Sequence, residues 1–268
     1  MSFTGEIRKF LLKTGYVRET TVGGAVVFES EDLAVIPVPI SARTLEEAIA
    51  VHDHILEVRK QLSKPVVILP QDRWMAGGDM TRRRLLAHLH TFTSVFARFC
   101  EVRRIDKSAA AAFLSDNHSY GDASCRYRYG LFLKRDYKLP KGTMVAVSEF
   151  SAPRRWNKDG VIVSSYEWVR YASLPDVRVV GGMGKMLKAF IEDVKPDDVM
   201  TYADLEWSDG RAYRELGFEP EGERECVDFI VDPVNWYRLP LRGESTGGLY
   251  YRNFGSIKYR LKLGAFKY

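Results

Sequence analysis

The pattern of apolar and polar positions changes character near residue 97. Before that point, apolar residues between positions 44 and 62 recur every three or four positions, which predicts an amphipathic helix. A continuous apolar run, PVVILP at 65–70, is typical of a buried strand. A short helix at 4–14, strands at 25–30 and 33–38, and a helix at 79–90 that Asp79 can cap complete the set. Residues 1–96 are therefore expected to form a small α/β domain.

From residue 97 the pattern predicts strands first and a crossover later. A strand at 97–105 precedes a short helix that Asp106 can cap, and three strands follow at 125–134, 143–152 and 165–174. A glycine-rich turn, VVGGMG, then opens a helix at 185–194, before a strand at 198–204, a helix at 208–218 and a last strand region at 226–239. Three antiparallel strands followed by a βαβ crossover give a mixed sheet. The expected fold class is α/β with a mixed sheet, in a second domain spanning 97–241.

Composition narrows the class of protein. The 268 residues are 46% apolar and 28% charged, as in a soluble globular protein, and no apolar run approaches the roughly 20 residues of a membrane helix. The first residues lack the apolar core of a secretory signal. Cys100, Cys125 and Cys226 show no CxxC spacing, which argues against a zinc site or a disulfide framework and fits a reducing compartment. We therefore expect a cytoplasmic protein without a bound metal or a membrane partner.

The net charge of +5 is concentrated in two stretches. From Arg82 to Arg104 six arginines face the single acid Glu101, and from Arg242 to Tyr268 six Lys and Arg face the single acid Glu244. Such stretches attract phosphate, but they can equally be solvated basic surfaces. The last stretch, 242–268, also alternates aromatic with basic residues. It predicts either a β-hairpin covering the sheet or a surface that stacks bases and holds phosphates of DNA or RNA.

The turn VVGGMG is the strongest chemical signal. A turn that follows a strand and starts a helix exposes backbone N–H groups at the positive end of the helix dipole, where a pyrophosphate binds well. Gly181, Gly182 and Gly184 remove side chains that would keep an anion at a distance. A tight strand-to-helix turn without a ligand has the same composition, so the turn alone leaves both interpretations open.

In its context this turn resembles motif A of the GNAT acyltransferases. Gly182 and Gly184 take the motif's glycine positions, whereas its usual Arg or Gln falls on Val179, with Arg178 one residue early. Downstream, AYRELGF at 212–218 is similar to the second helix of that family and its terminal Gly-Phe. The resemblance covers about half the chain. It implies acetyl-CoA or another acyl-CoA as cofactor, held by Ser173, Leu174, Arg178, Val179, Val180, Gly181, Gly182, Met183, Gly184 and Lys185.

The implied chemistry is transfer of an acyl group from a thioester to an amine, which needs a base for the amine proton and often an acid for the leaving thiolate. Glu167 is the first candidate base, and Glu149 is the second, because it alternates with Val145 and Val147 and should be partly buried. Tyr213 is the candidate acid. His118 lies in the loop where the family admits its acceptor. Each also has an ordinary structural interpretation: an ion pair for the carboxylates, core packing for Tyr213, and a structural loop residue for His118.

A narrower similarity leads to an alternative function. NHSYG at 117–121, Arg170 and VVGG together resemble uncharacterised phage-like or mobile-element proteins in which a GNAT-like domain follows a nuclease-like region. The first domain supplies Glu29, Glu31 and Asp32 but lacks the following Lys of a nuclease core, so we expect no cleavage activity from it. In QDRW at 71–74, Trp74 is expected to be a packing anchor between the domains. The alternative is thus a GNAT-like protein that binds DNA or RNA without acyl transfer. An enzyme should keep a cleft open between the strands at 165–174 and 198–204, and a binding protein should fill it with side chains.

Overall fold

The computed structural model describes residues 2–14, 18–158, 160–243 and 247–263. The chain divides into two compact units by contact. Unit 1 comprises Met1–Arg82, Tyr202–Arg211 and Gly222–Lys258, and unit 2 comprises Arg83–Thr201, Ala212–Glu221 and Tyr259–Tyr268. The expected division into 1–96, 97–241 and 242–268 differs from these units, because segments distant in sequence enter the same unit.

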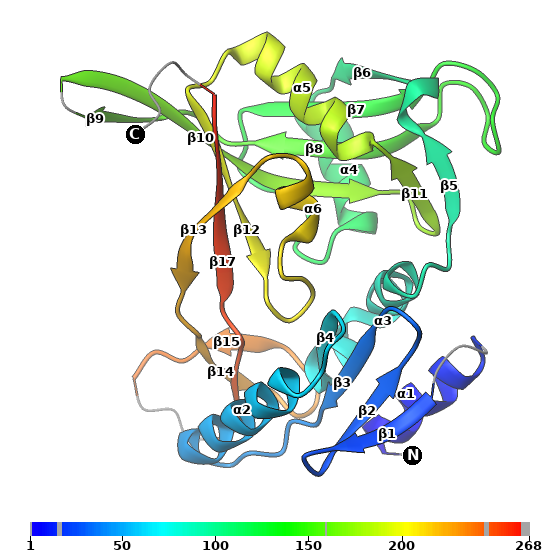
Figure 1. The fold of residues 1–268 in the computed structure, drawn as a ribbon, viewed down its shortest axis with the longest axis vertical. Helices are drawn as coiled ribbons and strands as arrows, with labels where there is room; N and C mark the ends of the chain where they lie inside the picture. Colours follow the sequence, from blue (N-terminus) through cyan, green and yellow to red (C-terminus); the bar gives the residue numbers. More distant parts are fainter. Residues whose placement is uncertain (1, 15–17, 159, 244–246, 264–268) are drawn as a thin grey trace. The chain divides into compact units, whose positions relative to one another are not determined.

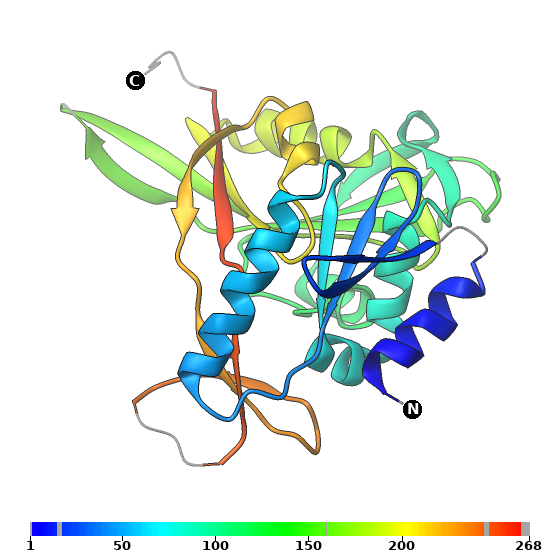
Figure 2. The same cartoon turned by 60° about the horizontal axis from the view of Figure 1, so that its bottom comes forward.

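Unit 1 contains two small sheets. The first has the order β1-β2-β3-β4, from Arg18–Val22, Ala25–Glu29, Ala34–Val38 and Val66–Pro70, and β3 and β4 run parallel. The second has the order β15-β14-β16, from Arg238–Pro240, Asp228–Val231 and Leu249–Arg252. Helix α2 (Leu45–Lys60) connects β3 to β4 and packs against β16 (Figure 2). Residues of both sheets share one apolar core that includes Val27, Ile36, Ile68, Val231 and Tyr251.

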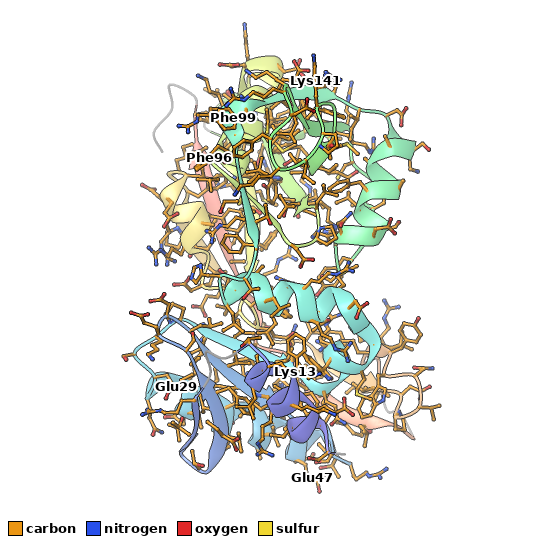
Figure 3. The ribbon with its side chains drawn as sticks, turned by 90° about the vertical axis from the view of Figure 1, so that its right-hand side faces the viewer. Lys13, Glu29, Glu47, Phe96, Phe99 and Lys141 are labelled. Carbon is orange, nitrogen blue, oxygen red and sulfur yellow. The ribbon has the colours of Figure 1, made fainter. Side chains whose placement is uncertain are left out.

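The helices of unit 1 begin where the sequence places their caps. Thr44 caps α2 through its hydroxyl, which accepts the Glu47 N–H at 3.2 Å, and Glu47 (labelled in Figure 3) accepts the Arg43 N–H at 2.6 Å. Helix α1 spans Phe3–Leu12, and α3 spans Gln71–His88 with a kink at Gly78, where φ is 47°. The helix expected at 79–90 is therefore the second half of a longer element. Trp74 is buried against Phe10 and under Arg82, both in unit 1. The role expected for it between domains stays untested.

The large sheet has the order β13-β17-β12-β10-β8-β7-β6 (Figure 1), and it belongs to unit 2 except for residues 202–204, 222–224 and 256–258, which are counted with unit 1. Its strands are β6 (Cys100–Arg104), β7 (Tyr127–Leu133), β8 (Met144–Phe150), β10 (Val161–Ser173), β12 (Asp198–Asp204), β13 (Glu219–Arg224) and β17 (Ser256–Lys262), and β9 (Arg154–Lys158) pairs with the first half of β10. The 3-10 helix η1 (Ala97–Phe99) precedes β6. Neighbours from β6 to β10 are antiparallel, whereas β10 and β12 are parallel. The mixed sheet and the α/β class expected from the sequence are confirmed.

Alternate residues of β8 contact helices on opposite faces of this sheet. Val147 packs with Phe113 and Leu114 of α4 (Lys107–Asn117), whereas the Phe150 ring stacks on the Phe190 ring of α5 (Gly182–Val194) at 3.9 Å. We call these the α4 face and the α5 face, and Figure 1 shows the sheet between the two helices. Asp106 caps α4 as expected, since its carboxylate accepts the Ala109 N–H at 2.8 Å.

Three details of the fold differ from the sequence expectations. Strand β5 (Thr93–Phe96) pairs in parallel with β11 (Val177–Val180), a two-stranded sheet that the pattern does not predict. Helix α6 is short, Arg211–Glu215. In the C-terminal stretch β16 pairs with β14 and β17 joins the large sheet, so these strands do not form the expected hairpin. Glu244 and Lys267, which enter the charge count of that stretch, lie outside the described residues.

Candidate functional site

The glycine turn starts α5 with free N–H groups. Gly181 is the N-cap in a left-handed conformation, with φ of 76° and ψ of 6°, and no side chain caps this helix end. The strand before it is β11, whose last residue, Val180, is 45% exposed. The first turn of the 13-residue helix thus presents backbone donors and the positive end of its dipole beside an exposed position.

Close packing explains why residue 182 is a glycine. A Cβ at this residue would lie 2.9 Å from the Tyr171 hydroxyl and 2.9 Å from Cβ of Val179, closer than real contacts allow. Val179 is buried beneath the turn. The position that carries Arg or Gln in motif A is therefore a core position here, which is why an apolar residue occupies it.

The other residues expected to hold the cofactor have varied surroundings. Lys185 directs its ammonium group to the carbonyls of Ala97 at 2.9 Å and Cys100 at 2.6 Å, so it ties α5 to the start of β6. Arg178 is exposed and its guanidinium lies over the Phe92 ring. Ser173 donates to the Val177 carbonyl at 2.8 Å and closes the turn from β10 to β11, while Leu174 packs on the α4 side. Met183 and Gly184 are half-buried.

Glu149 lies on the α4 face, fully buried. Its carboxylate accepts the Arg128 Nε–H at 3.0 Å and the Ala123 backbone N–H at 3.2 Å. Glu149 is directly opposite Arg128 on β7 and Arg170 on β10, so a basic residue lies on either side of it across the strands. The burial expected from its alternation with Val145 and Val147 is confirmed.

Burial and a second carboxyl group raise the pKa of Glu149. Removal from water is the largest cause, followed by a hydrogen bond to Asp122 and the charge of Asp122, and the pKa rises to about 7. The Ala123 N–H and Arg128 oppose this shift. Oδ1 of Asp122 is buried and has no hydrogen-bond partner. The Glu149 carboxyl group can therefore hold or release a proton near neutral pH.

The loop after α4 completes this group of residues on the α4 face. The pKa of the buried Cys125 thiol rises to about 12, chiefly through burial, with Glu149 raising it further and Arg128 and Arg170 lowering it. Glu167 also acts on this thiol, so both candidate bases lie near Cys125. Arg170 donates to the Gly121 carbonyl at 3.2 Å. Sequence reasoning missed Asp122, Cys125 and Arg128, because the loop alone gives no sign that it returns to cover β8.

The raised pKa of Glu149 predicts a pH dependence of stability. A proton retained by the native state up to about pH 7 favours folding below that pH, so this contribution is full below about pH 4.5 and is lost as pH rises towards 7. Glu149→Gln should therefore gain stability relative to the unmodified protein, on the order of 1–3 kcal/mol between pH 5 and pH 8. Urea unfolding at both pH values measures the difference.

Asp193→Asn provides the matched control for this pH experiment. Hydrogen bonds from Arg104 and Tyr129 lower the pKa of Asp193, so that group is ionised throughout the interval in both states. Its relative stability should not change from pH 5 to pH 8. An equal change in both variants would contradict the assignment of the effect to Glu149.

Strands β10 and β12 part beside Trp168. Their parallel pairing covers Ser165–Glu167 against Asp198–Met200, and β10 is irregular between Trp168 and Arg170. The Thr201 hydroxyl donates to the Trp168 carbonyl at 3.0 Å. The rings of Tyr213 and Phe218 pack against the buried Trp168 ring, and Tyr213 also contacts Tyr259. Aromatic side chains thus fill part of the space where β10 and β12 part. The cleft is neither fully open, as expected for an enzyme, nor fully filled, as expected for a binding protein.

Tyr213 and His118 are both neutral at physiological pH. Burial raises the pKa of Tyr213, while a hydrogen bond with Thr201 opposes the shift, so the phenol keeps its proton. Burial first, then Arg170 and Arg84, lower the pKa of His118 to about 4. Nδ1 of His118 accepts the Tyr120 N–H at 3.1 Å, which leaves the proton on Nε2. In this state His118 is a hydrogen-bond donor rather than a base.

The basic stretches are dispersed over several elements and many of their charges are paired. Arg98 lies over the rings of Phe96 and Phe99, both labelled in Figure 3, and Arg104 pairs with Asp193 at 2.7 Å. In the C-terminal stretch Arg252 pairs with Asp228 at 2.6 Å, and Arg260 pairs with Asp198 and Glu221. Binding of nucleic acid through these stretches stays a prediction.

Within the ranges that the structure describes, no group of three or more His, Cys, Asp or Glu side chains is arranged to hold a metal ion. Glu29 (labelled in Figure 3) instead accepts from Thr20 at 3.3 Å and lies 3.5 Å from Arg18. Among the described helices, none has both the length and the apolar content needed to cross a bilayer.

Comparison with known proteins gives matches among solved structures alone. No protein-family model matches the chain, and no curated protein does. The solved structures include a probable N-acyltransferase of unknown function from Enterococcus faecalis (16% identity, 50% of this chain, 35% of that chain, TM-score 0.36). They also include Arabidopsis thaliana NAA60 in complex with acetyl-CoA, at 8% identity over 61% of this chain and 99% of that chain, with a TM-score of 0.40. A spermidine N-acetyltransferase from Vibrio cholerae matches at 9% identity over 62% of this chain and 94% of that chain, with a TM-score of 0.36.

The strand order of unit 2 can be compared with the fold expected from the sequence. An antiparallel run of β7, β8 and β10 leads through α5 to β12, which is parallel to β10 and parts from it. This strand order agrees with the fold that the motif resemblance implies, and it brings the glycine turn, the β10–β12 divergence and Glu149 into one unit.

Proposed function

We propose that the protein is an N-acyltransferase that moves an acyl group from acyl-CoA to an amine. The observation that carries this proposal is the start of α5, where Gly181 and Gly182 leave the first N–H groups uncapped directly after β11. Uncapped donors at a helix dipole suit the pyrophosphate of CoA. The parallel pairing of β10 with β12 ends after Glu167 and Met200, and beyond this point a pantetheine arm can pair with the strands.

Each candidate residue has one role in this proposal. Gly181, Gly182, Met183 and Gly184 offer backbone donors, and Lys185 fixes the helix start rather than touching phosphate. Glu149, with its pKa near 7, takes the amine proton, directly or through a water that reaches this buried carboxyl group. Tyr213 keeps a proton that can pass to the leaving thiolate. Glu167 stays the alternative base on the same face.

Acyl-CoA binding is the first prediction to test. A negative charge beside the uncapped helix start should repel the pyrophosphate, so Val180→Glu is expected to raise the Kd for acetyl-CoA by about tenfold or more, which is about 1.4 kcal/mol or more. Val180 suits this test because it is already exposed, whereas a side chain at Gly182 would clash. Calorimetric titration with acetyl-CoA and with CoA measures the change.

Ile162→Glu is the matched control for this titration. Ile162 is 65% exposed and lies in the first half of β10, far along the strand from the turn. This variant should bind acetyl-CoA as the unmodified chain does. If the unmodified chain shows no saturable binding at millimolar ligand, the acyltransferase proposal is wrong. Equal weakening in both variants would place the cofactor elsewhere.

A further inference from the structure

Unit 1 contains a cysteine, a histidine and an aspartate in a continuous chain of contacts. Cys226, which is half-exposed between β13 and β14, has its Sγ 3.4 Å from Nε2 of His52. Nδ1 of the same imidazole lies 2.9 Å from Oδ1 of Asp53. All three residues belong to unit 1, and His52 and Asp53 lie on α2, next to β16 (Figure 2). None of them belongs to the acyl-CoA site described above.

The contacts fix which nitrogen of His52 carries the proton. An ionised carboxylate only accepts hydrogen bonds, so the Asp53 contact places the proton on Nδ1. Nε2 is then an acceptor that faces the thiol. This is the relation that a general base has to the nucleophile that it activates, with a third group orienting the base.

The imidazole is also held by packing. Its ring stacks on the Phe254 ring at 4.8 Å, and the His52 side chain is buried. The same imidazole lines a pocket with mostly apolar walls, formed with Val38, Ile40, Ala48, Tyr250 and Phe254. The imidazole thus contacts the thiol on one side and lines this pocket on the other.

The backbone around Cys226 is pinned on both sides. Asn253 accepts the Val227 N–H through Oδ1 at 2.6 Å and donates its own N–H to the Val227 carbonyl at 3.1 Å. Gly255, with φ of 69°, lies so close to the Arg224 carbonyl that a Cβ there would be 2.4 Å from that oxygen. A segment held this way keeps the thiol in register with the imidazole.

The groups around Cys226 determine the protonation state of its thiol. Burial raises the pKa of Cys226, Asp228 and Asp53 raise it further, and Arg252 opposes them. The resting group is thus a neutral thiol that gives up its proton during attack rather than a permanent thiolate. Such a nucleophile depends on its base for reactivity.

We propose that Cys226 is a nucleophilic thiol, activated by His52, which Asp53 orients, and that it accepts an acyl group from an ester or thioester. In this step Sγ bonds to the carbonyl carbon as the thiol proton passes to Nε2 of His52. The bond to the alkoxide or thiolate leaving group breaks, and that group departs with the proton. Water then attacks the S-acyl carbonyl carbon while Nε2 of His52 takes a proton from that water. The C–S bond breaks, His52 passes this proton to the departing thiolate, and the carboxylic acid and free thiol result.

The experiment uses the full chain with 4-nitrophenyl acetate as the acyl donor. We expect a burst of 4-nitrophenolate equal to the amount of protein and one acetyl group on the peptide that contains Cys226. His52→Gln should slow the burst by about 10²-fold or more, as loss of a general base does. Cys226→Ser should remove the thioester adduct.

Two further variants keep this test decisive. His54→Gln, the same substitution at an exposed position of α2, should leave the burst unchanged. Asp53→Asn, at a side chain that is 67% exposed, should slow the burst without loss of thermal stability. If His52→Gln fails to fold, the Asp53 variant decides alone. Acetylation at other residues, or a full burst rate in folded His52→Gln or Asp53→Asn, would overturn the proposal.

Discussion

Replacement of Glu149 by glutamine is expected to lower the turnover rate of acyl transfer by about 10²- to 10⁴-fold, the range that a positioned general base supplies. The Kd for acetyl-CoA should change little, because Glu149 lies on the α4 face and the proposed pyrophosphate site is the start of α5. Release of the CoA thiol, with spermidine and a lysine-containing peptide as probe amines, measures the rate. Titration with acetyl-CoA measures the Kd.

The pH dependence of that rate separates a base from a structural carboxylate. Because the pKa of Glu149 is raised to about 7 by burial and by Asp122, the active carboxylate form should accumulate as pH rises from 6 to 8. The unmodified protein should gain rate over that interval. The residual rate of Glu149→Gln should not rise between pH 6 and pH 8, whereas the rate of a variant that is merely destabilised would still rise.

Glu167→Gln is the matched comparison, since it makes the same change to the other carboxylate beside Cys125. If Glu149 is the base, the Glu167 variant should retain most of the rate. A full rate in Glu149→Gln together with a loss in Glu167→Gln would transfer the role to Glu167. Full rates in both variants would exclude Glu149 and Glu167 as the base.

Asp72→Asn is expected to have the largest effect on stability, a loss of about 3–5 kcal/mol in the free energy of unfolding, as for a buried ion pair that loses one partner. Both side chains of the pair are buried in unit 1, with Arg238 7% exposed and Asp72 2% exposed. The guanidinium binds the carboxylate through two nitrogens, one of them at 2.7 Å. Urea unfolding followed by circular dichroism at pH 7 measures the loss.

The surroundings of Arg238 explain why no other group can replace the Asp72 carboxylate as its partner. Glu206 is 3.4 Å away and buried, and its carboxylate already accepts the Tyr251 hydroxyl at 2.7 Å. Burial raises the pKa of Glu206, and Arg238 is the main group that opposes this shift. Without Asp72 the guanidinium would keep one longer contact in a space closed to water.

The exposed pair of Lys60 with Glu57 on α2 is the control for the Asp72 prediction. Its side chains are 69% and 63% exposed and lie 2.6 Å apart. Glu57→Gln should change stability by less than about 1 kcal/mol, because water already solvates both charges. A loss of that small size in Asp72→Asn would show that the buried pair does not organise unit 1.

Much of the local structure could be predicted because its causes are local. Thr44 and Asp106 cap their helices with their own side chains, and the apolar residues around Glu149 place it in a strand, β8, that is buried on both faces. The glycine turn before α5 follows from Gly181, whose positive φ few other residues adopt. Strands β5 and β11 were missed, since a two-stranded parallel pair of four residues per strand depends on a partner distant in sequence.

The candidate sites show the same division. The sequence by itself determined the mixed sheet, the uncapped turn, and the burial of Glu149, because period and residue type act over a few positions. The tertiary structure alone decided that Asp122 returns to Glu149, that Val179 is a core residue, and that Cys226 meets His52 across 174 positions of chain. Proton affinity and nucleophile activation depend on distance and burial in space, and a linear pattern contains neither.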